Sequence, residues 1–171
     1  MSDFDEPVDH LAMQAERALE SGELAKAEQL YAEVARRRPE RADAHLGLAR
    51  IALQQGRPAD ALKALPNALR ADPQLLAAYE LLALLGRHGG VGDMAIEWLE
   101  FGARQLPREP RLFAWLVHLY ASEGRTEDLT MCLEHFGRLS GLTRRRAAIL
   151  FTRDAALPED LKSRIAIAAG F

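Results

Sequence analysis

The strongest constraint in this sequence is a period of 34 residues that recurs in four separate columns of positions. One column holds glycine four times in succession, two hold alanine three times and one holds proline three times. The columns are Gly22, Gly56, Gly90 and Gly124; Ala15, Ala49 and Ala83; Ala27, Ala61 and Ala95; and Pro39, Pro73 and Pro107. Self-similarity at a fixed period of this length is the signature of a repeat architecture. The chain is therefore expected to fold as stacked copies of one unit.

Each column has a mechanical reason, and together the reasons describe a pair of helices. The glycine ends the first helix, because a residue without Cβ adopts the left-handed backbone conformation at little cost. The small alanines let the paired helices approach closely. The proline ends the second helix, because it lacks an N–H group and its ring clashes with the preceding turn. The predicted unit is a helix, a tight turn and an antiparallel second helix.

This pattern resembles the tetratricopeptide repeat family, whose unit of 34 residues has small, aromatic and proline positions in the same order. The resemblance covers about residues 8–141. It implies an all-α fold, a right-handed solenoid of helical hairpins with three good units and a degenerate fourth. The units are expected at about residues 8–41, 42–75, 76–109 and 110–141. In the fourth, Val117 and Leu129 replace the small alanines, and Gly141 stands where the proline is expected.

The segments outside the repeats have separate expectations. Residues 1–7 are expected to form a flexible acidic N-terminus. After Gly141, Thr143 is predicted to cap a helix over about residues 144–153, and Pro158 to open another that contains Ile165 and Ile167. Residues 142–171 are thus predicted to be capping helices. The sequence leaves open whether they cover the last apolar face or form an interface.

Neither the composition nor the motifs of the sequence indicate a catalytic, metal or nucleic-acid site. The formal charge of -3 provides no overall attraction to nucleic acid. We find no glycine-rich phosphate loop after a strand, no His-Glu-x-x-His motif and no paired cysteines. Cys132, the only cysteine, lies three residues from His135, but two ligands do not make a zinc site. We therefore expect no enzyme activity, no cofactor, no metal and no nucleic-acid partner.

The expected location follows from two further absences in the sequence. No stretch has the roughly 20 apolar residues of a membrane-spanning helix, and the first residues lack the basic flank and apolar stretch of a signal peptide. We expect no membrane insertion and a cytoplasmic protein.

If the units stack as the resemblance implies, the first helix of each lines a concave groove that holds a protein or peptide. Projection by repeat position gives the groove residues Met13, Glu16, Leu46, Arg50, Leu53, Glu80, Leu81, Leu84, Arg87, Arg111, Trp115, His118 and Ser122. An apolar strip with arginines beside it predicts a partner of apolar and acidic character. The leucines and Trp115 could instead belong to the core, because apolar residues at helical spacing often do.

Three roles remain open at this point. The first is a non-catalytic adaptor, scaffold or assembly factor that binds an extended or helical segment of a partner. The second is a structural subunit that self-associates, with the possibility of a homo-oligomer formed through the C-terminal helix. The third is a chaperone, since length and repeat number are similar to those of the translocator chaperones of type III secretion. The family's clamp for a terminal carboxylate is missing, because its positions hold Ala12, Glu16, Gly47, Ala77 and Leu81.

Overall fold

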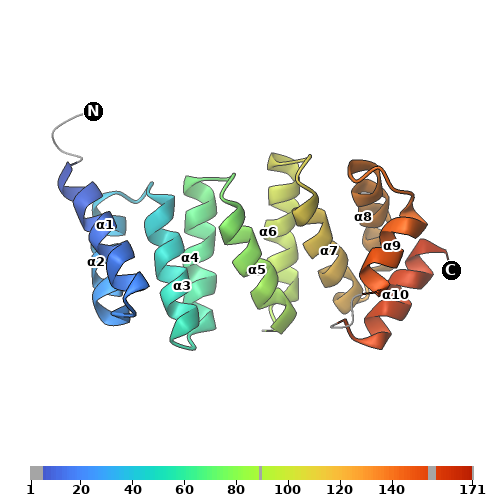
Figure 1. The fold of residues 1–171 in the computed structure, drawn as a ribbon, viewed down its shortest axis with the longest axis horizontal. Helices are drawn as coiled ribbons and strands as arrows, with labels where there is room; N and C mark the ends of the chain where they lie inside the picture. Colours follow the sequence, from blue (N-terminus) through green and yellow to red (C-terminus); the bar gives the residue numbers. More distant parts are fainter. Residues whose placement is uncertain (1–5, 89, 154–156, 171) are drawn as a thin grey trace. The chain divides into compact units, whose positions relative to one another are not determined.

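The computed structural model describes residues 6–88, 90–153 and 157–170, and every regular element in those ranges is a helix. The all-α prediction is confirmed. Figure 1 shows the helices in chain order. They are α1 (Glu6–Glu20), α2 (Leu24–Arg37), α3 (Ala42–Gln54), α4 (Pro58–Ala71), α5 (Leu76–His88), α6 (Gly92–Gln105), α7 (Pro110–Glu123), α8 (Thr126–Leu139), α9 (Arg144–Thr152) and α10 (Glu159–Ala169). Of the N-terminus expected to be flexible, residues 1–5 lie outside the described ranges, and α1 begins at Glu6.

The turn glycines adopt the left-handed conformation that their column predicts. The φ angles of Gly22, Gly56, Gly90 and Gly124 are 74°, 69°, 65° and 70°. At three of these turns the residue after the glycine donates its N–H to the carbonyl five residues earlier: Glu23 to Ala18 at 2.8 Å, Arg57 to Ala52 at 2.7 Å and Arg125 to Tyr120 at 2.9 Å. These bonds satisfy carbonyls that the end of the first helix would leave free.

The chain divides into two compact units, residues 1–81 and residues 82–171, with the boundary inside α5. In unit 1, α1 packs against α2 and α3, and α3 packs against α2 and α4. Figure 1 shows α1 and α3 in front of α2 and α4.

The column alanines at the helix contacts are fully buried, namely Ala15, Ala27, Ala49 and Ala61. A Cβ atom added to Gly47 of α3 would lie 2.5 Å from the Tyr31 ring of α2, so only glycine fits there.

In unit 2, α7 packs against both α6 and α8, and two further helices follow. Helix α9 begins after Thr143, whose side chain accepts a hydrogen bond from the backbone N–H of Arg146. Helix α10 begins after Pro158 and packs against α7, α8 and α9. The two helices predicted after the repeats are therefore present.

Helix α10 covers the core of unit 2 with one face only. Ile165 is fully buried, whereas Ile167 is 68% exposed. Arg164 donates to the carbonyls of Ala121 at 2.8 Å and Ser122 at 3.1 Å, at the end of α7. The helix therefore closes the last repeat and still presents an apolar side chain to solvent.

The repeat register predicts different responses at two neighbouring positions of α4. Ala61 is fully buried, so replacing it with Leu overfills the helix contact and should lower the free energy of unfolding by about 1 to 3 kcal/mol. The Lys63 side chain is 79% exposed and forms a surface ion pair with Asp60, so Lys63→Leu should cost less than about 0.5 kcal/mol. Urea unfolding followed by circular dichroism compares them. Equal destabilisation by the two variants would show that the register is wrong.

Candidate functional site

In each unit, the first helices of the repeats present some of the predicted groove residues to solvent. In unit 1, Met13 is 54% exposed and Arg50 is also exposed. In unit 2, Leu84 is 47% exposed and Arg87 is exposed. Neither of these two arginines has a hydrogen bond or ion pair within the described ranges. Each unit thus carries an accessible apolar side chain and an available guanidinium on its first helices.

Other predicted groove residues are placed differently. Leu46 is only 7% exposed and belongs to the core, because α3 is enclosed by α1, α2 and α4; of the two placements that the sequence left open for the leucines, Leu46 has the core one. Arg111 was expected to face a partner, but its Nε donates to Glu109 at 2.8 Å. His118 is half-buried, and its ring packs edge-on against Phe151 of α9 with centroids 5.4 Å apart. Trp115 and Leu81 are also half-buried.

A hollow of about 390 Å³ opens between α1 and α3 in unit 1, and Met13 lines it. We call it the α1–α3 hollow. Its lining consists of Asp9, Ala12, Met13, Glu16, Tyr31, Arg41 and Asp43. Met13 and Glu16 were predicted to face a partner. The other five were not among the predicted groove residues. The hollow therefore combines an exposed apolar side chain with a charged rim.

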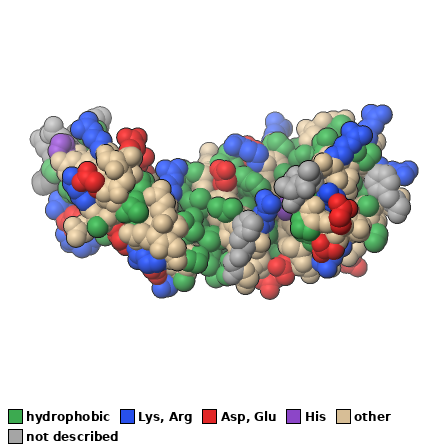
Figure 2. Space-filling view, turned by 60° about the horizontal axis from the view of Figure 1, so that its bottom comes forward, with side chains coloured by type: hydrophobic (Ala, Val, Ile, Leu, Met, Phe, Trp, Pro, Cys, Tyr) green, Lys and Arg blue, Asp and Glu red, His purple; other side chains and the backbone are tan. Residues whose placement is uncertain are grey.

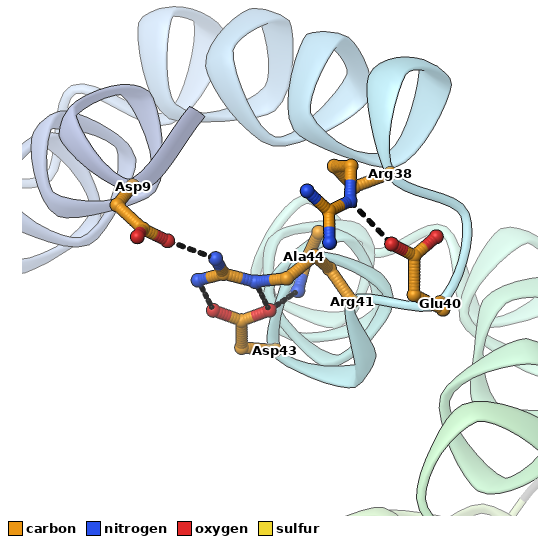
Figure 3. Close-up of polar contacts among 6 residues, drawn as sticks. All are labelled: Asp9, Arg38, Glu40, Arg41, Asp43 and Ala44. Atoms are coloured by element: carbon orange, nitrogen blue, oxygen red, sulfur yellow. Dashed lines mark hydrogen bonds and ion pairs between the residues drawn. The ribbon is translucent and has the colours of Figure 1, made fainter. Parts of the chain in front are cut away.

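Arg41 organises one side of this rim. Its guanidinium donates to the Asp43 carboxylate at 2.6 and 3.0 Å and also to Asp9 of α1, so one side chain joins α1 to α3 (Figure 3). Asp43 also accepts the backbone N–H of Ala44 at 2.9 Å. The hydrogen bond from Arg41 holds the pKa of Asp43 below its usual range. Asp43 is therefore ionised at neutral pH.

Tyr31 forms the other side. Its ring is almost fully buried, and its hydroxyl donates to the carboxylate of Glu16. Burial, followed by the hydrogen bond to Glu16, raises the pKa of Tyr31 well above its ordinary value. The rim thus holds the carboxylates of Asp9, Glu16 and Asp43 against the single guanidinium of Arg41. This excess of negative charge beside Met13 is suited to a ligand in which a positively charged group lies next to an apolar one.

Charges of both signs lie beside one another over the face of unit 1 seen in Figure 2. The sequence predicted an acidic partner, and this prediction was inferred from arginines alone. The surface of unit 1 carries charges of both signs instead. Arg50 lies close enough to Tyr31 for its positive charge to lower the pKa of that hydroxyl, against the larger effects that raise it. Unit 1 therefore offers a negative hollow with a positive charge near it.

Cys132 and His135, which lie on one helix, engage different groups. The Cys132 thiol is buried and lies 3.2 Å from the carbonyl oxygen of Phe113. Burial raises the pKa of Cys132 to about 12. His135 Nε2 lies 3.3 Å from the carbonyl oxygen of Pro107. Cys132 thus packs as a neutral thiol inside unit 2.

Comparison with known proteins assigns the family. The family model described as Tetratricopeptide repeat matches residues 12–75 and 52–110, which is more than half of the chain. The chain belongs to the tetratricopeptide repeat family. No curated protein sequence matches it. Across the described helices, none is long and apolar enough to cross a membrane.

Several solved structures have a similar tetratricopeptide repeat fold. A crystal structure of MamA protein has a TM-score of 0.67 at 18% identity, over 95% of this chain and 88% of that chain. MamA from Desulfovibrio magneticus RS-1 has a TM-score of 0.64 at 17% identity, over 98% and 92%. A thermophilic repeat protein of Thermus thermophilus has a TM-score of 0.51 at 19% identity, over 94% and 98%. At these identities the likeness concerns the fold alone.

The hydroxyl of Tyr31 should give this tetratricopeptide repeat chain a pH-dependent stability. Its pKa is raised in the folded state, so the stabilisation is complete below the ordinary tyrosine pKa of about 10 and is lost as the pH rises above it. Tyr31→Phe should lower the free energy of unfolding by about 1 kcal/mol at neutral pH. The difference from wild type should narrow in alkaline solution. Urea unfolding at neutral and alkaline pH measures it, and an unchanged difference would contradict the burial of this hydroxyl.

Proposed function

We propose that this protein is a non-catalytic interaction module, an adaptor or assembly factor, that binds an extended or helical segment of a partner on the first helices of unit 1. The observation that carries the proposal is Met13, an exposed apolar side chain inside a hollow with a charged rim. Exposed apolar groups surrounded by polar ones are typical of protein interfaces. Membership of a helical repeat family supports the same function.

The chemistry of the partner follows from the charges around Met13. An apolar side chain of the partner packs on Met13 and Ala12, and a neighbouring lysine or arginine meets the carboxylates of Asp9 and Glu16. A carboxylate elsewhere in the segment is suited to Arg50, which has no competing partner of its own among the described residues. Charge-assisted hydrogen bonds of this kind select the partner, while apolar contact provides affinity. The partner is thus apolar with charges of both signs.

The α1–α3 hollow suits binding better than catalysis. Arg41 holds Asp43 ionised and fixes its position, so Asp43 is not available as a proton donor at neutral pH. The thiol of Cys132 lies in the other unit and is kept neutral by burial. The features of the hollow are those of a recognition surface.

Two lysine substitutions at exposed methionines test the site. Met13→Lys removes the apolar contact and places a cation among the carboxylates, so it should prevent binding of a partner's cation. Met94→Lys is the matched control, because Met94 is similarly exposed, at 41% against 54%, but lies on α6 outside the α1–α3 hollow. Affinity capture from native cells with mass spectrometry compares the variants with wild type.

We expect Met13→Lys to lose proteins that wild type and Met94→Lys both retain. Recovered amounts should fall at least about tenfold, because a buried apolar contact and an ion pair together contribute more than about 1.4 kcal/mol. Capture of the same proteins in the same amounts by both variants would refute binding at the α1–α3 hollow.

A second candidate function is self-association through α10, and the exposure of Ile167 favours it. Ile167 is 68% exposed on a helix whose opposite face is buried in unit 2, and Leu150 of α9 is 54% exposed. Large apolar side chains left in solvent at the last helices of a solenoid are suited to contact with a second copy.

Ile167→Lys tests this candidate without removing α10, since Ile165 and Arg164 still hold the helix to unit 2. Sedimentation velocity over a range of concentrations should show a dimer for wild type and a monomer for the variant. A wild-type protein that stays monomeric at the highest concentration excludes self-association.

A further inference from the structure

A second hollow lies in unit 2, on the face formed by the second helices of the repeats. It has a volume of about 480 Å³ and is lined by α6, α7 and the α8 region. Helix α7 packs against both α6 and α8, and Figure 1 shows these two helices behind it. We call this the α6–α8 hollow. It shares no residue with the α1–α3 hollow, so its function can be tested separately.

The middle of the α6–α8 hollow is apolar. Phe113 and Leu116 of α7 contribute surfaces that are 9% and 3% exposed, and Ala103 of α6 lies beside them. Met131 of α8 is 63% exposed at the same place. Methionine is unbranched and flexible, so its side chain adapts to apolar groups of different shape. The hollow therefore has a preformed apolar floor and one adaptable wall.

Two arginines at one end of the hollow belong to a fifth column of the repeat. Arg36, Arg70, Arg104 and Arg138 are 34 residues apart, each in the last turn of a second helix. A cation in the last turn interacts favourably with the helix dipole, which gives the column a structural reason. Of the four arginines in this column, Arg104 and Arg138 line the α6–α8 hollow.

The residue three positions before the arginine differs between the repeats. In α2 it is Glu33, which pairs with Arg36 at 2.7 Å. In α4 it is Asn67, whose amide oxygen accepts from Arg70 at 2.9 Å. In α6 and α8 the same position holds Phe101 and His135. The acceptor provided by the first two repeats is thus replaced by a ring in the last two.

As a consequence, neither Arg104 nor Arg138 is paired with a carboxylate in the described part of the chain. Arg104 forms no hydrogen bond or ion pair in the described part of the chain. The one polar contact of Arg138 there is Nδ1 of His135 at 3.5 Å. The His135 ring lies on Phe113 with centroids 4.2 Å apart, and its Nε2 points to the Pro107 carbonyl. This end of the hollow is positive and lies beside the apolar floor.

The opposite end is already neutralised. Arg125 donates to Asp128 at 2.7 Å and to Glu100 at 3.4 Å, and its guanidinium lies 4.9 Å from the centre of the Tyr120 ring. Three arginines therefore face two carboxylates around the hollow, and the excess positive charge lies at the end of Arg104 and Arg138.

We infer that the α6–α8 hollow is a second docking site, which binds a partner segment with a carboxylate next to apolar side chains. The carboxylate lies between Arg104 and Arg138, and the apolar side chains pack on Phe113 and Met131. From Asp128 to Arg138 the lining of α8 runs about 15 Å at 1.5 Å per residue, the length of four or five extended residues. A polynucleotide fits poorly, because Glu100 and Asp128 would repel its next phosphates.

Selection of random peptides displayed on phage, with the full chain as bait, provides the probes. Selected peptides are then synthesised, and their affinities are measured by fluorescence anisotropy. The test variant carries Arg104→Gln and Arg138→Gln. The control carries Arg36→Gln and Arg70→Gln, the same column outside the hollow. Circular dichroism verifies that both variants keep the helical content of wild type.

We expect the selection to yield peptides with an acidic residue beside apolar ones. Their affinity should fall at least about tenfold in the test variant and stay within about twofold in the control, since only the test variant loses the charge-assisted hydrogen bonds to the carboxylate. Added salt should weaken binding to wild type. Met13→Lys should bind the same peptides as wild type does, which separates this site from the α1–α3 hollow.

Three results would overturn the inference: no peptide whose affinity depends on Arg104 and Arg138, equal losses in the test and control variants, or binding of a single-stranded oligonucleotide that requires these arginines while acidic peptides do not bind.

Discussion

The close approach of paired helices, at positions where only hydrogen or a methyl group fits, is the constraint on which the rest of the structure depends. Ala15, Ala27, Ala49 and Ala61 are fully buried in unit 1, and a Cβ atom on Gly47 would overlap the Tyr31 ring. A larger side chain at such a position separates the two helices of a pair. The neighbouring repeats pack on these helices, so their positions change as well. Since Tyr31 fills the space beside Gly47 and also bonds to Glu16, the same contact positions the α1–α3 hollow.

The fold could be predicted from the sequence because its signals are local. A glycine with φ near 70° ends a helix wherever it stands, Thr143 caps α9 through its own side chain, and Pro158 precedes α10. Exposure could be predicted less well, because it depends on how many helices surround a position. Leu46 is buried since α3 has three neighbouring helices, and His118 is partly covered by Phe151 of α9. Projection by repeat position assumes that equivalent residues of all repeats have the same neighbouring helices. This assumption fails for His118, because α9 follows the fourth repeat.

The candidate site could be predicted only in part, for a related reason. Met13 and Glu16 follow from their place in the first helix, but Asp9 and Arg41 are separated by 32 residues and meet only when α1 stacks on α3. No local pattern marks that pairing. The sequence presents arginines and acids as separate surface charges, whereas the folded chain joins some and leaves others available. Partner chemistry depends on the charges left available, so it requires the contacts as well as the composition.

A second periodic contact differs in the fourth repeat, beside the α6–α8 hollow. In the second repeat His45 Nε2 lies 2.8 Å from the Pro39 carbonyl, and in the third the Tyr79 hydroxyl donates to the Pro73 carbonyl at 2.9 Å. The equivalent residue of the fourth is Phe113, which has no donor, and the Pro107 carbonyl is instead approached by His135 of α8. The His135 ring also lies on Phe113, and its Nδ1 is the group that Arg138 meets, where the first repeat has the carboxylate of Glu33. In the fourth repeat the group that approaches the proline carbonyl thus comes from the second helix, and the same residue occupies the position that provides an acceptor for the arginine in the first two repeats. The first three repeats keep the same small residues where their helices pack, whereas the residues that satisfy the polar groups of each repeat vary, so binding chemistry can differ between repeats of one fold.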